Sequence, residues 1–257
     1  MGRPLSAFLT SLPLPFAGAV AAAARLGFGT VDVVAVADRP PSDLEALAEG
    51  GVLVGCAALG RDLPPGCALD AADVSLRRRA VEHVRRQLAD AARLGATAAY
   101  LVPPFGGERL PLFAEACALL AEDAASRRVR LLVEHVPGRA LPTVAATLAW
   151  LGDVGHPSLA LLLDVGHCLI SGEAVGDAVR RAGGRLGHVH LDDNDGVDDL
   201  HWPLLTGRLT EADLASLAAA LTEVGYRGGL ALELNAANAD PEAALAEGKA
   251  IAERCGL

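Results

Sequence analysis

The feature of this sequence that most constrains its fold is an alternation of short apolar runs with longer helical segments. Eight runs have the length and composition of buried strands: 5–9, 31–36, 52–57, 98–102, 130–134, 159–164, 187–191 and 229–233. Between and after them lie segments with helical periodicity: 16–26, 42–48, 74–94, 108–126, 142–151, 173–181, 211–224 and 241–254. Such strand–helix units, repeated at about 30 residues, predict parallel strands joined by right-handed crossovers.

Eight units close naturally into a barrel, so the sequence predicts an α/β fold with a single (β/α)8 TIM-barrel domain over residues 1–257. The alternative is a doubly wound open sheet, which usually has a glycine-rich turn after its first strand. Here the first strand leads into residues 10–13 (TSLP), and no G-x-G-x-x-G sequence follows it. Expected helix boundaries are the caps Ser42 and Thr210 at helix starts and Gly27, Gly95 and Gly225 after helix ends.

The charge balance limits the partners. The 257 residues carry a formal net charge of −10, which argues against an extended nucleic-acid partner because such proteins usually present basic faces. Arginines at 77–79 and 85–86 could form a basic patch, but they fall in a helical segment and are better explained as its solvated face. The sequence thus predicts no nucleic-acid partner.

Cysteine usage and hydropathy bear on the compartment. The five cysteines are scattered and contain no C-x-x-C pair, which is typical of buried thiols in a reducing cytoplasm. Pro13 and Pro15 interrupt an apolar run near the N-terminus, so we expect an amphipathic helix there rather than a signal peptide. No uninterrupted apolar run reaches about 18 residues, so no membrane span is expected. These features predict a cytoplasmic protein.

Ionisable residues occur at the ends of four consecutive apolar runs. Three runs end in Glu134, Asp164 and Glu233, and the run between the last two contains His190. One charged strand end is weak evidence, because it can also be a solvent-facing terminus or a helix cap. In a barrel, however, the carboxyl ends of the strands converge on one mouth, and three carboxylates gathered there without a cation would repel one another. The set therefore predicts one divalent metal ion, Mn²⁺, Mg²⁺, Co²⁺ or Zn²⁺.

Motifs around these residues resemble those of the xylose-isomerase-like superfamily of TIM barrels. The resemblance covers nearly the whole chain and rests on the segments 22–32 (AAARLGFGTVD), 132–135 (LVEH), 163–167 (LDVGH), 187–194 (GHVHLDDN) and 232–235 (LELN). The superfamily contains ketose 3-epimerases, sugar-phosphate epimerases, enzymes that process hydroxypyruvate or inosose, and apurinic-site endonucleases. These motifs are specific to the superfamily but not to one substrate.

Carried over residue by residue, the resemblance implies that Glu134, Asp164, His190 and Glu233 are the metal ligands. It also implies that His167, three residues after the aspartate, lies beside the substrate and polarises it or hydrogen-bonds to it. A histidine at the rim, bonded only to its own loop, would have the same spacing.

Two further histidines lie next to these motifs. His188 shares strand parity with His190 but lies one layer deeper, so a second-shell or hydrogen-bonded core role is expected rather than direct ligation. His135 directly follows Glu134 and should point the opposite way, which favours a structural or loop role.

The stretch 199–209 (DLHWPLLTGRL) resembles the family pattern D-x-H-x-P-x-G-x-G, but Leu205 stands where the first glycine is usual. The motif therefore does not determine the backbone path of this loop. In the endonuclease branch an Asp-x-His at this place binds an additional metal, and in the small-molecule branches the loop lies over the substrate. We expect the second arrangement, with His201 and Trp202 contacting the substrate, whereas simple packing of both on the rim is the alternative. The role of Asp199 stays open.

The site chemistry and the resemblance together favour a metal-dependent isomerase or epimerase acting on a sugar or sugar phosphate. A cation that chelates a ketose carbonyl and its neighbouring hydroxyl acidifies the α-carbon and stabilises the enediolate. Glu134 and Glu233 are then the catalytic groups that remove and return the proton on opposite faces, with His167 as a proton source. The same enolate can expel water, so a dehydratase of a keto-polyol or dehydroshikimate-like substrate is the main alternative.

Two other functions are less favoured. An apurinic-site endonuclease of this superfamily uses histidines from the early strands, and here none precedes His83, which falls in the middle of a helical segment. A protein that uses its metal only for stability is the remaining alternative.

The substrate is expected to be a small carbohydrate, and its phosphorylation is not fixed by the sequence. Arg61 and Arg109 could meet a phosphate, although a surface position explains each more simply. Sugar stacking would depend on Phe16, Phe105 and Trp202, of which the two phenylalanines could equally be core residues. A homodimer is allowed by the sequence but not specified by it.

Overall fold

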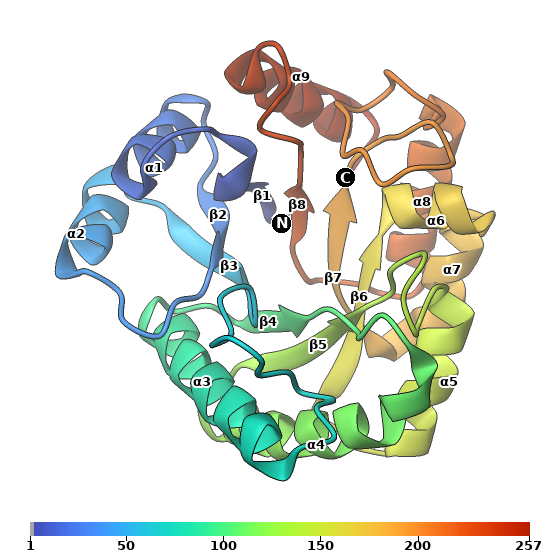
Figure 1. Cartoon of the computed structure of the whole chain (residues 1–257). Coiled ribbons are helices and arrows are strands. Elements are labelled where there is room, and N and C mark those ends of the chain that lie inside the picture. Colours follow the sequence, from blue (N-terminus) through green and yellow to red (C-terminus); the bar gives the residue numbers. More distant parts are fainter. Residues whose placement is uncertain (1–2) are drawn as a thin grey trace.

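The computed structural model describes residues 3–257, and its eight strands close into one parallel barrel. Each strand pairs with the next, and β1 pairs with β8. The strands are β1 (Leu5–Phe8), β2 (Thr30–Val34), β3 (Leu53–Ala58), β4 (Ala98–Leu101), β5 (Arg130–Glu134), β6 (Leu159–Asp164), β7 (Leu186–Leu191) and β8 (Leu230–Leu232). In Figure 1 they lie at the centre of a ring of helices. The predicted (β/α)8 TIM barrel is confirmed.

Helices follow the strands on the outside of the barrel. They are α1 (Phe16–Arg25), α2 (Pro41–Gly50), α3 (Val74–Arg93), α4 (Leu110–Ser126), α5 (Val144–Val154), α6 (Val165–Ser171), α7 (Val175–Ala182), α8 (Glu211–Glu223) and α9 (Pro241–Arg254). Short 3-10 turns lie at Leu9–Ser11, Gly107–Arg109 and Gly183–Arg185. The helix α6 is not among the expected segments. It begins directly after β6 because Asp164 caps it: the carboxylate accepts a 2.7 Å hydrogen bond from the His167 backbone N–H.

Most of the expected caps are present. Thr210 forms a capping box with Asp213 at the start of α8, and the three glycines expected after helix ends have positive φ: Gly27, Gly95 and Gly225. The expected Ser42 cap is wrong. The helix α2 starts one residue earlier, at Pro41, whose fixed φ suits a first helical position.

Side-chain parity along the strands separates two apolar regions. In β6, Leu161 and Leu163 belong to the large cluster between strands and helices, whereas Ala160 and Leu162 lie in the smaller cluster inside the barrel. Asp164 continues the inward parity of Ala160 and Leu162. The same alternation points each predicted ligand inward at the carboxyl end of its strand, with Glu233 directly after β8, and the four side chains converge there.

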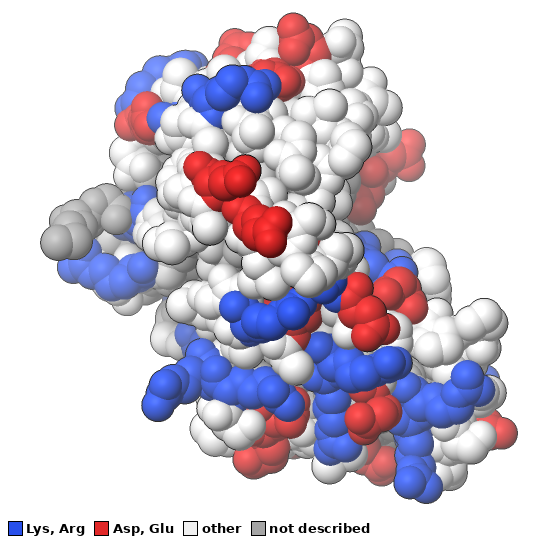
Figure 2. All heavy atoms as spheres, turned by 90° about the vertical axis from the view of Figure 1, so that its left-hand side faces the viewer, with Lys and Arg blue, Asp and Glu red and all other residues white. Residues whose placement is uncertain are grey.

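One outer face is basic. Four arginines of α3 line a shallow groove against α4: Arg77, Arg78, Arg79 and Arg85. Figure 2 shows Lys and Arg side chains gathered over one part of the face that it presents. Among residues 3–257, no helix is both long and apolar enough to span a bilayer. The five cysteines are free thiols.

Candidate active site

Four ligand atoms meet at the carboxyl end of the barrel, one from each of the side chains Glu134, Asp164, His190 and Glu233, here called the ligand cluster. These atoms all lie within 4.8 Å of one another. The imidazole is central: His190 Nδ1 lies 2.5 Å from Glu233 Oε2, 3.5 Å from Glu134 Oε1 and 3.8 Å from Asp164 Oδ2. The structure therefore brings together all four side chains that the sequence nominated.

Burial and charge strongly perturb the cluster. Burial lowers the pKa of His190, but the carboxylates of Glu233 and Glu134 outweigh it and the net shift is well upward. Burial raises the pKa of Glu233, but the charge of His190 and its hydrogen bond outweigh the effect of burial, and the pKa falls to about 2. The pKa of Asp164 is raised well above its usual value, by burial first and by Asp192 second. The buried cluster thus holds excess negative charge that calls for a positive counter-charge.

The donor set fits a divalent cation. Asp164 Oδ2 and both ring nitrogens of His190 are buried and have no partner in hydrogen-bond geometry among the described residues, although other polar atoms lie close. Three carboxylates and one imidazole are hard and borderline donors that suit Mg²⁺, Mn²⁺, Co²⁺ or Zn²⁺. A cation at this point would satisfy the unpaired atoms and neutralise the carboxylates together.

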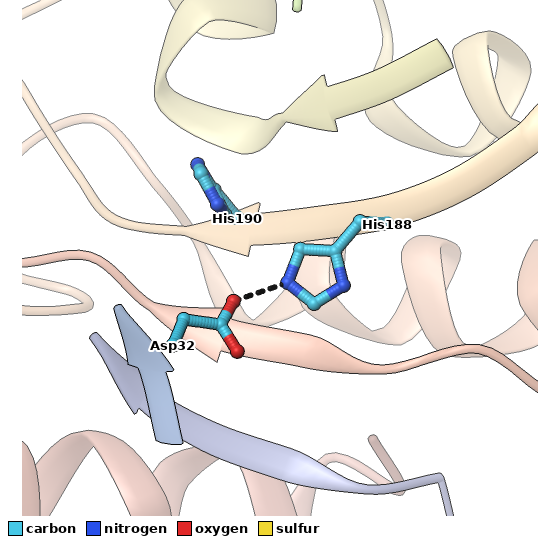
Figure 3. A group of neighbouring side chains, drawn as sticks. All are labelled: Asp32, His188 and His190. Carbon is cyan, nitrogen blue, oxygen red and sulfur yellow. Dashed lines mark hydrogen bonds and ion pairs between the residues drawn. The ribbon is translucent and has the colours of Figure 1, made fainter. Parts of the chain in front are cut away.

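Beneath the cluster, His188 is held in a separate pair with Asp32. Figure 3 shows the two side chains pointing toward one another, with His190 above them on the same strand as His188. His188 Nε2 lies 2.6 Å from Asp32 Oδ2, and the other oxygen of that carboxylate accepts the Cys56 backbone N–H at 3.1 Å. The His188 ring meets the His190 ring edge-on, with centroids 5.5 Å apart. This geometry agrees with the hydrogen-bonded core role expected for His188.

His167 stands beside the cluster and begins a chain of polar contacts toward solvent. Its Nδ1 donates to the His135 carbonyl at 2.8 Å, and its Nε2 lies 3.2 Å from Asp199 Oδ1. The same Asp199 oxygen lies 3.2 Å from His201 Nε2. Burial lowers the pKa of His167, but the negative charges of Asp164 and Asp199 outweigh the effect of burial, and the pKa rises to about 10. His167, Asp199 and His201 (the rim triad) thus store a proton next to the ligand cluster.

His135 has the opposite electrostatic character. Its Nε2 accepts the Asp164 backbone N–H at 3.1 Å, so this nitrogen carries no proton. Burial, followed by the charge of His167, lowers the pKa of His135 to about 3. The residue is completely buried behind the site, which agrees with the structural role expected from its parity.

The loop between β7 and α8 is anchored by Asp193. Its backbone pairs with Trp202, and its carboxylate accepts the backbone N–H groups of Gly207 at 2.6 Å and Leu209 at 2.8 Å. The open question about Leu205 is answered by its φ of 65°: the leucine adopts the left-handed conformation that a glycine would adopt more easily.

A cavity of about 370 Å³ opens above the ligand cluster, at the lower end of the range typical of ligand sites. Its lining includes four of the five residues predicted to contact substrate: His167, His201, Phe105 and Arg61. Trp202, the fifth, is not among the lining residues, because it lies in the strand-like pairing with Asp193. Arg109 is exposed and outside the lining as well.

Sequence reasoning missed Arg139, which lines the cavity from the loop after β5. Its signal was available, because a βα loop directly after a strand that carries a ligand opens onto the same mouth. It also missed Tyr100 of β4, whose ring packs edge-on against His190 with centroids 5.2 Å apart. A buried aromatic residue in an apolar strand gives no such signal.

Comparison with known proteins is consistent with this geometry. The family model of the xylose isomerase-like TIM barrel matches residues 20–255. An L-ribulose 3-epimerase of Mesorhizobium japonicum is 35% identical over 46% of this chain and 38% of its own length. A D-psicose 3-epimerase of Enterocloster bolteae is 28% identical over 40% of this chain and 31% of its own length. The alignments therefore span less than half of either relative.

Among solved structures, a D-psicose 3-epimerase crystallised in the presence of D-fructose superimposes with a TM-score of 0.84. It is 18% identical, and the superposition covers 98% of this chain and 99% of that one. At this identity the likeness concerns the fold.

Proposed function

The chain belongs to the xylose isomerase-like TIM barrel family, and from this premise we propose that it is a metal-dependent sugar epimerase. The proposed reaction inverts the carbon next to the carbonyl of a ketose through an enediolate. One observation supports it above all: the carboxylates of Glu134 and Glu233, from strands on different sides of the mouth, come together within 4.8 Å in the ligand cluster. The names of the relatives, L-ribulose and D-psicose 3-epimerases, support the same class of reaction.

The ligand cluster is the proposed holder of the cation. When bound, a divalent cation there supplies Lewis acidity toward a carbonyl and its neighbouring hydroxyl. Asp164 and His190 contribute no reacting proton in this scheme. Their part is to hold the geometry, since Asp164 is fixed by the His167 backbone N–H and His190 is packed between Tyr100 and His188.

Glu134 and Glu233 are the proposed bases. Each is a carboxylate at the floor of the cavity, and β5 and β8 are separated by two other strands. A ketose seated between them presents opposite faces of its α-carbon to the two carboxylates. One carboxylate removes the proton, and the other returns a proton to the opposite face, which inverts the centre.

His167 is the proposed donor to the developing oxyanion. His167 lines the cavity, and its Nε2 lies 3.2 Å from Asp199 Oδ1. It can donate a hydrogen bond to a substrate oxygen and receive a replacement proton through the rim triad. This role needs no movement of the backbone.

An epimerisation assay tests the proposal. The manganese- or magnesium-loaded protein is incubated with L-ribulose, D-psicose and their C3 epimers, and products are separated by chromatography. We expect interconversion of at least one pair, its loss on chelation and its return when the metal is restored. A product lighter by one water would replace the proposal with the dehydratase alternative. Metal-loaded protein that leaves every ketose and ketose phosphate unchanged would contradict it.

A further inference from the structure

Two arginines in the cavity have no carboxylate partner. Arg61, in the loop after β3, and Arg139, in the loop after β5, both line the cavity. Arg61 donates from Nη2 to the Tyr100 hydroxyl at 3.0 Å, and Arg139 donates from Nη1 to the Pro103 carbonyl at 3.0 Å. Within residues 3–257, no Asp or Glu oxygen lies within 4.0 Å of either guanidinium.

This arrangement differs from that of the surface arginines, many of which pair with a neighbouring acid. Arg127, for example, pairs with Asp123 at 2.9 Å, and Arg180 pairs with Glu223 at 2.8 Å. Near Arg61, the carboxylate of Asp62 is occupied elsewhere, since it lies 2.9 Å from the imidazole of His83. The positive charges at the cavity mouth therefore remain available to a ligand.

The two guanidiniums influence each other. The pKa of Arg139 is lowered, first by partial burial and second by the charge of Arg61. Neither is held by an ion pair: Arg139 Cζ lies 4.0 Å over the ring of Phe105, and Arg61 donates to the Tyr100 hydroxyl with its Cζ 5.8 Å from the centroid of that ring. Two like charges kept together by neutral supports form a preorganised site for an anion.

Their positions fix the orientation of such an anion. The Tyr100 hydroxyl accepts a hydrogen bond from Arg61, and the ring of Tyr100 packs edge-on against His190. Only the side chain of Tyr100 therefore separates Arg61 from the ligand cluster. Arg139 lies over Phe105, whose side chain is 78% exposed at the rim. The cavity thus runs from the ligand cluster at its floor to the two arginines at its outer wall.

We propose that the substrate is an anionic ketose, with a phosphate ester or carboxylate on its terminal carbon held by Arg61 and Arg139. This inference rests on the proposed epimerase function and adds to it the charge and orientation of the substrate. The carbonyl end of the sugar reaches the ligand cluster, and the anionic end stays at the wall formed by the loops after β3, β4 and β5. The chain as a whole carries a net charge of −10 and so repels anions in general. The two arginines therefore attract an anion at this wall of the cavity in particular.

The test compares matched substrates in the metal-loaded protein. A ketopentose 5-phosphate and a ketohexose 6-phosphate form the phosphate arm, the corresponding keto-sugar acids form the carboxylate arm, and the unsubstituted ketoses form the neutral arm. We expect kcat/KM for one anionic arm to exceed that for the neutral arm by about 100-fold, the range expected for hydrogen bonds between charged groups. The better arm identifies the anion.

Variants show whether the arginines cause the preference. Arg61→Met and Arg139→Met should each lower kcat/KM for the anionic substrate by about 10- to 100-fold, mainly through KM, and so reduce the ratio of anionic to neutral kcat/KM by a similar factor. Arg109→Met, an exposed arginine outside the cavity, is the matched control. Thermal melting of each variant checks that the fold is intact.

The outcomes separate the two proposals. Equal kcat/KM for neutral and anionic ketoses, or a preference unchanged in both arginine variants, overturns the anionic substrate and leaves the epimerase standing. Turnover of no ketose in any arm, by a protein shown to hold its metal, overturns the epimerase and this inference with it.

Discussion

The strands β5 to β8 and the strands β1 to β4 form matching halves of one barrel, yet the chemistry at their carboxyl ends differs. The second half supplies the whole ligand cluster and the rim triad. The first half ends in Val34, Ala58 and Leu101 at β2, β3 and β4, and contributes the Tyr100–Arg61 contact to the mouth. The difference shows that a symmetric scaffold can divide its work. The second half holds the reacting groups. The first half shapes the cavity and supplies Arg61, which by our inference reads the charge of the substrate together with Arg139 from the loop after β5.

The largest expected effect comes from the second half. Glu233→Gln should lower turnover of any substrate by about 10³-fold, because general base catalysis commonly contributes a factor of about 10²–10⁴. Steady-state kinetics with excess metal measures it. Glu49→Gln, an exposed glutamate on α2 in the first half, is the control and should be silent. Equal turnover by the two variants would contradict the claim that the reacting groups lie in the second half.

A second test concerns the loop between β7 and α8, which carries Asp199 and His201 of the rim triad. A Cβ added at Gly207 would collide with the backbone carbonyl of Asn194, so Gly207→Ala should destabilise the protein by about 1–3 kcal/mol and lower activity with it. Gly106→Ala, in the loop after β4, meets no atom within 4 Å and should change neither property. Urea unfolding of both variants sharpens the contrast between a constrained loop and an open one.

The pH dependence of stability probes the buried support of the second half. The pKa of His135 is about 3 in the folded protein and about 6.5 when unfolded, so below pH 6.5 the unfolded state binds a proton that the native state refuses. The contribution of His135 to the free energy of unfolding is complete above pH 6.5 and falls by about 1.4 kcal/mol per pH unit toward pH 3. His135→Gln retains an acceptor for the Asp164 N–H but does not titrate.

The measurement is the difference in unfolding free energy between wild type and His135→Gln at pH 7.0, 6.0 and 5.0. The advantage of wild type should shrink as the pH falls. A constant difference would mean that His135 is not held neutral in the native state.

The smallest expected effect lies in the first half. Tyr100→Phe removes the hydroxyl that accepts the Arg61 hydrogen bond but keeps the ring against His190. KM for the anionic substrate should rise about 3- to 10-fold, since one modest hydrogen bond is lost, and kcat should stay nearly constant. A fall in kcat instead would assign Tyr100 to the reacting half of the site.

Much of this account could be read from the sequence because the relevant signals are local. Each ligand follows its own apolar strand, and strand parity sends it inward. Eight strand–helix units then leave few topologies to consider. The positions of Glu134, Asp164, His190 and Glu233 in one cluster follow from these rules together with the motif resemblance.

The features that were missed depend on contacts, some across the barrel and some within a loop or a helix cap, that strand and helix periodicity does not report. His188 and Asp32 are 156 residues apart, and nothing in either strand specifies that they pair. Arg139 has no periodic signal, and only its place in the loop directly after the ligand-bearing strand β5 points to the cavity. The helix α6 was missed because its start depends on the Asp164 cap, and the left-handed Leu205 because its loop is set by the Asp193 contacts.

The central claim is that the ligand cluster carries out metal-dependent proton transfer next to a ketose carbonyl, and solvent-deuterium exchange followed by NMR tests it most directly. The metal-loaded protein is incubated in D₂O with neutral and anionic ketoses, beside Glu233→Gln and Asp164→Asn. The account predicts deuterium at the epimerised carbon, dependent on metal and absent in both variants, with no loss of water from the sugar. Absence of exchange in every ketose, from a protein shown to hold one cation per chain, would contradict it.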